Sequence, residues 1–225
     1  MNLTDRYYLR LAVAYIRGEL PELADQYPET LSSLEQEVLE KIFYIGKDKG
    51  LKVHRFKKTM PLPRISKSIG ILLGIQPSNL LDIGTGRGVF LIPLLEAIPA
   101  LAITCIDLLD HRIATLESLK KGGIGNITPL KMNTTKLSFE AEQFDMVTAL
   151  EVLEHIEQLE QAIGEICRVA RRHILFSVPS KEDDNPEHIH LLTLERLQPL
   201  FSQNGFGRIK ASSVHNHLLG LVTRR

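Results

Sequence analysis

The sequence predicts an α/β fold in which a doubly wound parallel sheet follows a helical N-terminal extension. Short apolar runs recur from Asn79 onward, and stretches with helical periodicity separate them. Before about position 76 the periodicity is helical only. Strands that are continuously apolar and alternate with helices are typical of a parallel sheet covered on both faces. We therefore expect a helical extension or lid over residues 1–76 and a sheet domain over residues 77–225.

The extension is expected to hold three helices. Apolar residues four apart, beginning with Leu3, give residues 3–15 one buried face, and residues 31–45 repeat this pattern. Ser32 with Glu35 matches a capping box at the start of the second helix. A third, short helix over about residues 64–73 leads into the sheet domain, after an extended connector at residues 60–63.

The sheet domain is expected to alternate strands with helices. The strands fall at residues 80–83, 101–106, 127–132, 144–150, 173–178, 206–213 and 218–223, and the helices at 88–98, 111–121, 156–171 and 193–204. Right-handed crossovers between parallel strands make such a sheet doubly wound.

A glycine-rich segment follows the first predicted strand. It runs Asp82, Ile83, Gly84, Thr85, Gly86, Arg87 and Gly88. Glycines here permit positive φ and close approach of the backbone to a ligand, and the start of the next helix offers N–H groups. A dinucleotide site, the competing interpretation, needs a small residue at position 89, where this chain has Val89. A carboxylate at the strand end suits a cationic amino-acid ligand, so Asp82 favours that class.

A second acid ends the next predicted strand. Asp107 comes nineteen residues after Gly88, where an acid can accept hydrogen bonds from both hydroxyls of a ribose. Leu108 follows and can cover one face of an adenine. The alternative is that Asp107 caps the helix that begins near His111, a role for which Asp110 is closer.

These motifs, with the segment from Phe144 to His155, resemble the successive motifs of class I S-adenosylmethionine (SAM)-dependent methyltransferases over about residues 79–223. The resemblance implies a Rossmann-like, mostly parallel, seven-stranded sheet whose last strand is antiparallel. Many members of the family have an aspartate where this chain has Asn133, so here an amide is expected to serve the adenine. The residues that the resemblance assigns to SAM are Asp82, Ile83, Gly84, Thr85, Gly86, Gly88, Asp107, Leu108, Asn133, Thr134 and Glu151.

The segment after the fourth predicted strand brings acids and a histidine together. Glu151, Glu154 and His155 have the spacing of one helical turn and should project the same way. The segment resembles two methyltransferase subgroups with metal-assisted O-methylation, those of ubiquinone biosynthesis and of small-RNA 2′-O-methylation, and the second subgroup adds a distant histidine, matched by His188. Similar segments occur in many methyltransferases that bind no metal.

We therefore expect His155 and His188 on the acceptor side as catalytic candidates and no metal. A divalent metal held by Glu151, Glu154, His155 and His188 is the alternative. The loop over residues 181–190 follows the fifth strand and can close over a substrate.

The composition is that of an ordinary globular protein. The net charge is zero, which removes any global electrostatic argument for a nucleic-acid or membrane partner. The segment 47–58 is locally basic and suits either a solvated connector or an anionic partner. Without a leader-type N-terminus, Cys105 and Cys167 are expected to be buried thiols in a reducing cytoplasm.

The expected function is transfer of a methyl group from SAM to a small molecule, with a hydroxyl as the candidate acceptor group. RNA is the alternative acceptor. A SAM-binding module without activity and a nicotinamide-dependent oxidoreductase are the other functions compatible with the glycine segment, the latter disfavoured by Val89.

Overall fold

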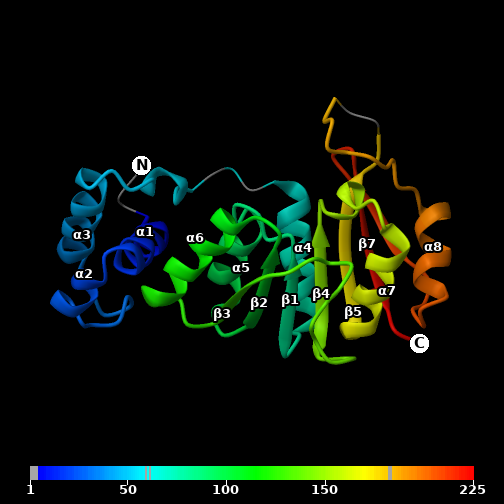
Figure 1. Ribbon diagram of the computed structural model, residues 1–225, viewed down its shortest axis with the longest axis horizontal. Helices are drawn as coiled ribbons and strands as arrows, with labels where there is room; N and C mark the ends of the chain where they lie inside the picture. Colours follow the sequence, from blue (N-terminus) through cyan, green and yellow to red (C-terminus); the bar gives the residue numbers. More distant parts are fainter. Residues whose placement is uncertain (1–4, 59, 61, 182–183) are drawn as a thin grey trace. The chain divides into compact units, whose positions relative to one another are not determined.

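The computed structural model describes residues 5–58, 60, 62–181 and 184–225, and it contains a seven-stranded sheet in the order β3-β2-β1-β4-β5-β7-β6 (Figure 1). The strands are β1 (Asn79–Ile83), β2 (Ala102–Asp107), β3 (Ile127–Lys131), β4 (Phe144–Leu150), β5 (Ala170–Pro179), β6 (Lys210–Val214) and β7 (His217–Thr223). β1 pairs in parallel with β2 and β4, and β4 with β5, whereas β7 is antiparallel to β5 and β6. The predicted doubly wound, mostly parallel sheet with seven strands is confirmed.

After β1 the helices alternate with these strands as predicted, whereas the extension contains four α-helices instead of the three expected, because α2 was not predicted. They are α1 (Arg6–Glu19), α2 (Pro21–Gln26), α3 (Gln36–Asp48), α4 (Pro63–Ile75), α5 (Leu91–Ala97), α6 (Asp110–Lys121), α7 (Leu159–Val169) and α8 (Leu194–Ser202), with 3-10 turns η1 (Val53–Arg55) and η2 (Leu153–His155). Among the described residues, no helix is long and apolar enough to cross a membrane. Leu3, parts of the connector at residues 60–63 and residues 182–183 of the loop after β5 lie outside the described residues.

The described residues form two compact units. One comprises the residues up to 60 with 110–129, and the other comprises 62–109 with 130–225. The helix α4, which the sequence places in the extension, groups with the sheet, and α6 groups with the N-terminal helices. The division into domains at residue 76 differs from this grouping and stays a prediction.

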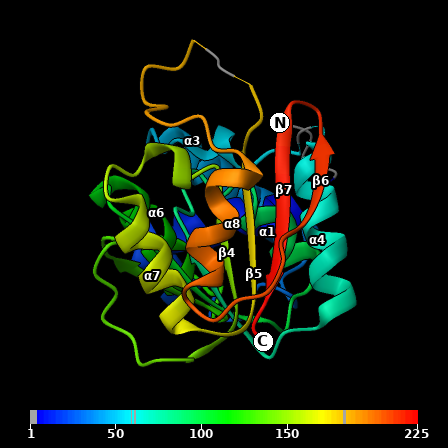
Figure 2. The ribbon, with the colours of Figure 1, turned by 90° about the vertical axis from the view of Figure 1, so that its right-hand side faces the viewer.

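The core of the second unit lies around its central strands. The first six of the seven residues of β4 are buried, as expected for a strand covered on both faces. Helix α7 buries its apolar face, which includes Leu159, Ile163 and Ile166, and packs against β5 and α8. Figure 2 shows α7 and α8 on one face of this part of the sheet and α4 on the other. Both cysteines, Cys105 and Cys167, are buried free thiols.

In the helical unit, α1 and α6 approach each other at two glycines. A Cβ atom on Gly18 of α1 would overlap the backbone of Ser118, and one on Gly122, just after α6, would overlap the carbonyl group of Ala14. The Ser118 hydroxyl also donates a hydrogen bond to Glu19. The two backbones therefore come close enough that no side-chain carbon fits between them.

The start of α3 differs from its prediction. The helix begins at Gln36 with Glu35 at its N-cap, and no side chain caps it. The hydroxyl of Ser32 instead shares a hydrogen bond with that of Thr30, so the predicted capping box is wrong. Short hydroxyl side chains close a local turn here rather than the helix, a competition that such residues often show.

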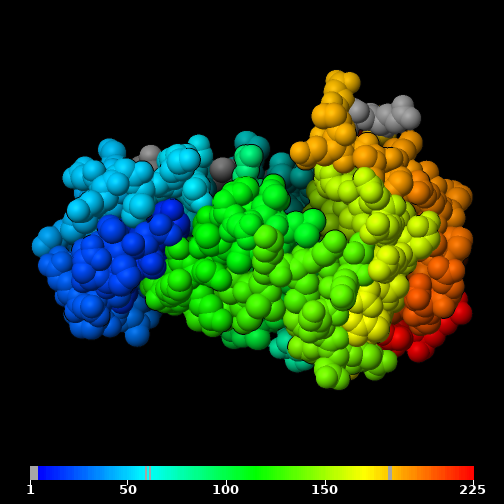
Figure 3. All heavy atoms as spheres, viewed as in Figure 1, coloured from blue at the N-terminus to red at the C-terminus, as the bar shows by residue number. Residues whose placement is uncertain are grey.

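The basic segment 47–58 packs against other residues of the helical unit. Val53 and Phe56 are buried, and Arg55 donates a hydrogen bond to the Thr115 hydroxyl (2.8 Å) and stacks over the Tyr15 ring. The segment lies at the surface in Figure 3. Its exposed basic residues are Lys47, Lys49, Lys52, His54, Arg55, Lys57 and Lys58.

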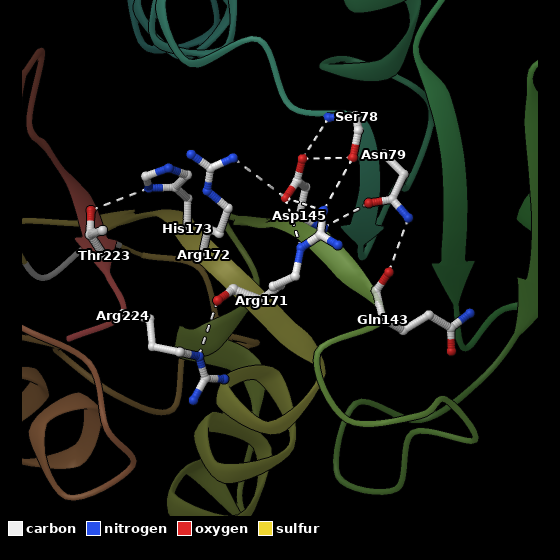
Figure 4. Close-up of polar contacts among 9 residues, drawn as sticks. All are labelled: Ser78, Asn79, Gln143, Asp145, Arg171, Arg172, His173, Thr223 and Arg224. Atoms are coloured by element: carbon white, nitrogen blue, oxygen red, sulfur yellow. Dashed lines mark hydrogen bonds and ion pairs between the residues drawn. The ribbon is translucent and has the colours of Figure 1, made fainter.

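A cluster of charged and polar side chains lies at the amino ends of β1 and β4 (Figure 4). Buried Asp145 accepts hydrogen bonds from the Ser78 hydroxyl (2.6 Å) and backbone N–H (2.8 Å), and from the Arg171 guanidinium (2.6 Å). Its own N–H donates to the side-chain oxygen of Asn79 (2.7 Å). Burial alone would raise the pKa of Asp145, but the hydrogen bonds from Ser78 and Arg171 outweigh it and hold that pKa well below its usual range.

We expect Asp145→Asn to lower the free energy of unfolding by about 2–3 kcal/mol at neutral pH, because the variant loses charge-assisted hydrogen bonds. A depressed folded-state pKa contributes stability above the unfolded-state value, near 3.8, and this contribution is lost as the pH falls below it. The difference between wild type and variant should therefore shrink in urea titrations below about pH 4. Glu157→Gln, at an exposed carboxylate, is the control. An equal loss of unfolding free energy in both variants would contradict the stabilising role of the Asp145 hydrogen bonds.

Candidate functional site

The predicted site residues meet at the carboxyl edge of the sheet, where the strand order reverses between β1 and β4. Open α/β sheets bind ligands in the crevice at such a switch point. Asp82 lies in β1 and Asp107 ends β2, while Glu151 directly follows β4. All of these residues belong to the second unit.

The glycine segment has the backbone that its sequence predicts. Gly84, Gly86 and Gly88 have φ values of 65°, 61° and 78°, which residues with a Cβ atom rarely adopt. A Cβ atom on Gly84 would lie 2.5 Å from Cγ2 of Val152, so Val152 closes the loop on one side. Helix α5 begins at Leu91, three residues after the predicted start, because a turn from Thr85 to Gly88 comes first.

Asp107 ties this loop to the end of β2. One carboxylate oxygen accepts a hydrogen bond from the N–H of Gly86 (2.9 Å) and the other from the N–H of Leu109 (3.0 Å). A carboxylate at the end of this strand is a group that can accept hydrogen bonds from ribose hydroxyls. Leu108 beside it is 57% exposed, as a residue that covers an adenine must be before the ligand binds.

Asp82 is a buried carboxylate with an unused acceptor. It is 3% exposed, and its Oδ1 accepts a hydrogen bond from the Thr148 hydroxyl (2.7 Å). Its Oδ2 is buried and accepts no hydrogen bond within the described ranges. Burial raises the pKa of Asp82 to about 6, which hydrogen bonds from Thr148 and Thr85 only partly oppose and the charge of Asp107 increases. Such a group favours a cationic partner, which restores the missing interaction.

The remaining SAM-assigned residues vary in how they are engaged. Ile83 and Thr134 are buried, as is Thr85, whose hydroxyl donates to the carbonyl oxygen of Asp82 (3.2 Å). The side-chain oxygen of Asn133 accepts hydrogen bonds from the N–H and hydroxyl of Thr135, both 3.0 Å. The same oxygen would have to accept a hydrogen bond from the adenine amino group, and here it already accepts two from Thr135. The adenine role of Asn133 therefore stays a prediction.

Glu151 does not share a helical turn with Glu154 and His155, so that prediction is wrong. Only residues 153–155 form a turn, η2, and Glu151 precedes it with φ of 58°. Its carboxylate faces the Ser177 hydroxyl (2.6 Å) and the His217 ring (2.8 Å). The left-handed backbone of Glu151, between β4 and η2, directs its side chain away from η2. The spacing of residues in the sequence does not reveal such a change of direction.

Glu154 and His155 instead meet the predicted distant histidine. One ligand atom from each of Glu154, His155 and His188 lies within 4.8 Å of the others, and the two histidine rings are 4.8 Å apart at their centroids. The carbonyl of Glu187 lies 2.8 Å from Nδ1 of His155, and the N–H of Ile189 donates to the Glu154 carbonyl (3.0 Å). Residues 187–189 are therefore fastened to η2.

Sequence reasoning missed four residues of this edge: Thr148, Ser177, His217 and Arg64. Thr148 and Ser177 carried a usable signal, because each is a polar residue near the carboxyl end of an otherwise apolar, buried strand. Such a residue needs a hydrogen-bond partner. His217 and Arg64 carried none, since they come from β7 and α4, elements far from Glu151 in the sequence.

A family model described as a methyltransferase domain matches residues 81–176, which hold the glycine segment, Asp107 and η2. The chain contains a class I SAM-dependent methyltransferase domain. The fold agrees with that of magnesium protoporphyrin IX methyltransferase from Synechocystis PCC 6803 with bound SAH, at a TM-score of 0.60 and 15% identity over 85% of this chain and all of that one. It also agrees with the methyltransferase domain of bacterial CtHen1-C, at a TM-score of 0.57 and 17% identity over 72% and 97%.

Relatives of the methyltransferase domain differ in what they methylate. A malonyl-[acyl-carrier protein] O-methyltransferase from Geobacter sulfurreducens is 28% identical over 46% of this chain and 39% of the relative. A ribosomal RNA small subunit methyltransferase G from Limosilactobacillus reuteri is 41% identical over 76 residues, 32% of each protein. The matches thus cover about two fifths or less of these relatives.

Proposed function

We propose that this protein transfers the methyl group of SAM to a small-molecule acceptor, with a hydroxyl as the preferred nucleophile. The observation that carries the proposal is the buried Oδ2 atom of Asp82, which has no hydrogen-bond partner among the described residues and lies beside a backbone of three left-handed glycines. A site that needs a cation at this place fits an amino-acid ligand with an ammonium group.

Each part of the edge suits one part of SAM. Asp82 would hold the ammonium group, and the glycine segment would let the methionine moiety approach the backbone closely. Asp107 would accept hydrogen bonds from the ribose hydroxyls. Leu108, with Asn133 and Thr134, would border the adenine.

SAM supplies a methyl group already activated by its sulfonium, so the protein's task is mainly to align the nucleophile with it. An acceptor hydroxyl must also lose its proton as its oxygen attacks. If Nδ1 of His155 donates to the Glu187 carbonyl, 2.8 Å away, Nε2 carries no proton in the neutral ring. In this proposal Nε2 of His155 takes the hydroxyl proton. His188, whose ring lies 4.8 Å from that of His155 between centroids, assists His155 in this role.

We expect His155→Ala to reduce turnover by about 10²- to 10⁴-fold, the usual contribution of a general base. The affinity for SAM should change by less than about threefold, because His155 is outside the glycine segment. Turnover is measured with labelled SAM, and affinity by calorimetry. His54→Ala, at an exposed histidine of the helical unit, is the control. Unchanged turnover in His155→Ala rejects the base.

The cluster of Glu154, His155 and His188 favours one alternative, a divalent metal that activates the acceptor oxygen. One carboxylate and two imidazoles are a suitable donor set for such an ion. Glu151 is directed towards Ser177 and His217 and is not part of this cluster. A chelator separates the two proposals: it stops turnover only if a metal takes part.

The nature of the acceptor is tested by sorting labelled product from a cell extract into small-molecule, RNA and protein pools. Label in the small-molecule pool supports the proposal. Label in RNA supports the alternative acceptor, which the similarity to a ribosomal RNA methyltransferase favours. SAM binding without label in any pool supports a binding module without activity.

A further inference from the structure

Glu151 has an unusual backbone at the point where β4 leaves the sheet. Its φ of 58° is left-handed, a conformation that side chains with a Cβ atom disfavour and that asparagine and glycine adopt more readily. Its N–H donates a hydrogen bond to the carbonyl oxygen of Ser177 (2.9 Å). Such a conformation persists only where the surroundings hold it, and these positions cluster at functional sites.

The surroundings that hold Glu151 are three side chains from three other elements, which we call the Glu151 clamp. The Ser177 hydroxyl, on β5, donates to Oε1 (2.6 Å). Nε2 of His217, on β7, lies 2.8 Å from Oε2, and Nε of Arg64, on α4, lies 3.8 Å from Oε1. The carboxylate is 23% exposed, so the contacts are partly shielded from water.

The His217 ring is itself fixed by the hairpin between β6 and β7. Its Nδ1 lies 2.9 Å from the carbonyl oxygen of His215 and must donate to it. His215 and Asn216 form the turn with φ values of 44° and 64°. The N–H of Ser180, after β5, donates to the carbonyl oxygen of Asn216 (2.8 Å). The clamp thus connects β4 to a part of the chain more than sixty residues away.

The residues directly after Glu151 belong to the proposed site. Val152 lies against Gly84, where it would overlap a Cβ atom, and His155 ends η2. A change in φ or ψ at residue 151 would swing both away from the cofactor loop and the acceptor side. We propose that Glu151, Ser177 and His217 are positioning residues that fix Val152 on the glycine segment and His155 on the acceptor side. The catalytic part of this inference rests on the proposed methyl transfer.

The test compares three variants that separate the backbone of Glu151 from its side chain. Glu151→Gly keeps the left-handed backbone without strain but removes the clamp. Glu151→Gln keeps the shape: its oxygen accepts from Ser177, and its amide stays beside Nε2 of His217. Ser177→Ala removes one contact from the other side. Measurements are amide hydrogen exchange, SAM affinity and, with an acceptor, kcat and KM.

We expect Glu151→Gly to raise amide exchange at residues 151–156 by about tenfold or more, with exchange in β1 and β5 unchanged. Its kcat should fall by about 10- to 100-fold, while the affinity for SAM changes by less than about threefold. Ser177→Ala should do the same more weakly. Glu151→Gln should keep amide exchange at residues 151–156 within about threefold of wild type.

Two results overturn the inference. If amide exchange at residues 151–156 is as slow in Glu151→Gly as in wild type, the clamp does not position Val152 and His155. A Glu151→Gln variant that exchanges like wild type but loses turnover or SAM binding means that the carboxylate touches a reactant itself. If no acceptor is ever methylated, the proposed function fails, and the exchange measurements still decide whether the clamp exists. Global unfolding of Glu151→Gly leaves Ser177→Ala to decide, by the same exchange measurement.

Discussion

Replacing Asp82 with asparagine should weaken SAM binding by about 100-fold or more, the size of effect expected when one partner of a buried ion pair is removed. The carboxylate is 3% exposed, and its Oδ2 has no protein partner in the described part of the chain. An ammonium group placed there would gain an interaction that water cannot replace. Gly86→Val should have an equally large effect, because a β-branched residue at φ of 61° is strongly disfavoured.

The pH dependence of binding checks the same assignment. Burial raises the pKa of Asp82 to about 6, so the ligand-free protein holds an extra proton between about pH 4 and pH 6 compared with the unfolded chain. Affinity for SAM should therefore rise with pH through about 6, as the carboxylate ionises. Calorimetry at several pH values measures this, and the dependence should disappear in Asp82→Asn.

Stability separates lost binding from lost folding in this test. A raised folded-state pKa means that the buried charge of Asp82 lowers the stability of the ligand-free protein as the pH rises from about 4 to 6, and this loss then stays constant at higher pH. Asp82→Asn removes that charge, so without ligand it should unfold no more easily than wild type at pH 7. Gly125→Val, at a glycine with open space around it, is the control for Gly86→Val. If Asp82→Asn or Gly86→Val still binds SAM with micromolar affinity, the proposed SAM site is wrong.

The backbone of the proposed cofactor side was predictable because its signals are local. The glycines at 84, 86 and 88 indicate a backbone that only glycine adopts easily, and the structure has positive φ at all three. The apolar runs predicted the sheet equally well, since a strand covered on both faces must be apolar along its length. Two strand boundaries were misjudged. The run at residues 206–213 contributes a strand only from Lys210, with Phe206 in an isolated bridge, and β5 begins at Ala170, inside the predicted helix 156–171.

The geometry of the proposed acceptor side was less predictable because distant residues decide it. The spacing of Glu151, Glu154 and His155 fits one helical turn, yet Glu151 turns away to Ser177 and His217. The energy that favours this comes from hydrogen bonds to β5 and β7, which no local pattern encodes. His188 was found because a family resemblance, rather than periodicity, related it to His155.

Gly122→Ala should lower the free energy of unfolding of the helical unit by about 3 kcal/mol, at the upper end of the usual cost of overpacking. A Cβ atom at this position would overlap the carbonyl group of Ala14 in α1. A backbone group cannot move aside by changing rotamer, so the helices must separate. Separation exposes apolar side chains of α1 such as Leu11 and Val13, which are buried along it. Gly18→Ala should act in the same direction, because its Cβ atom would meet the backbone of Ser118.

Urea unfolding followed by circular dichroism measures the effect, with Gly125→Ala as the matched control. A Cβ atom on Gly125 would have no other atom within 4 Å, so alanine there should be neutral or stabilise the protein slightly through the unfolded chain. Equal stability of Gly122→Ala and Gly125→Ala would contradict the close packing of α1 on α6. The packing also explains a feature that the sequence did not reveal. Helix α6 lies between two strands in the chain, but backbone contact at Gly18 and Gly122 groups it with the N-terminal helices.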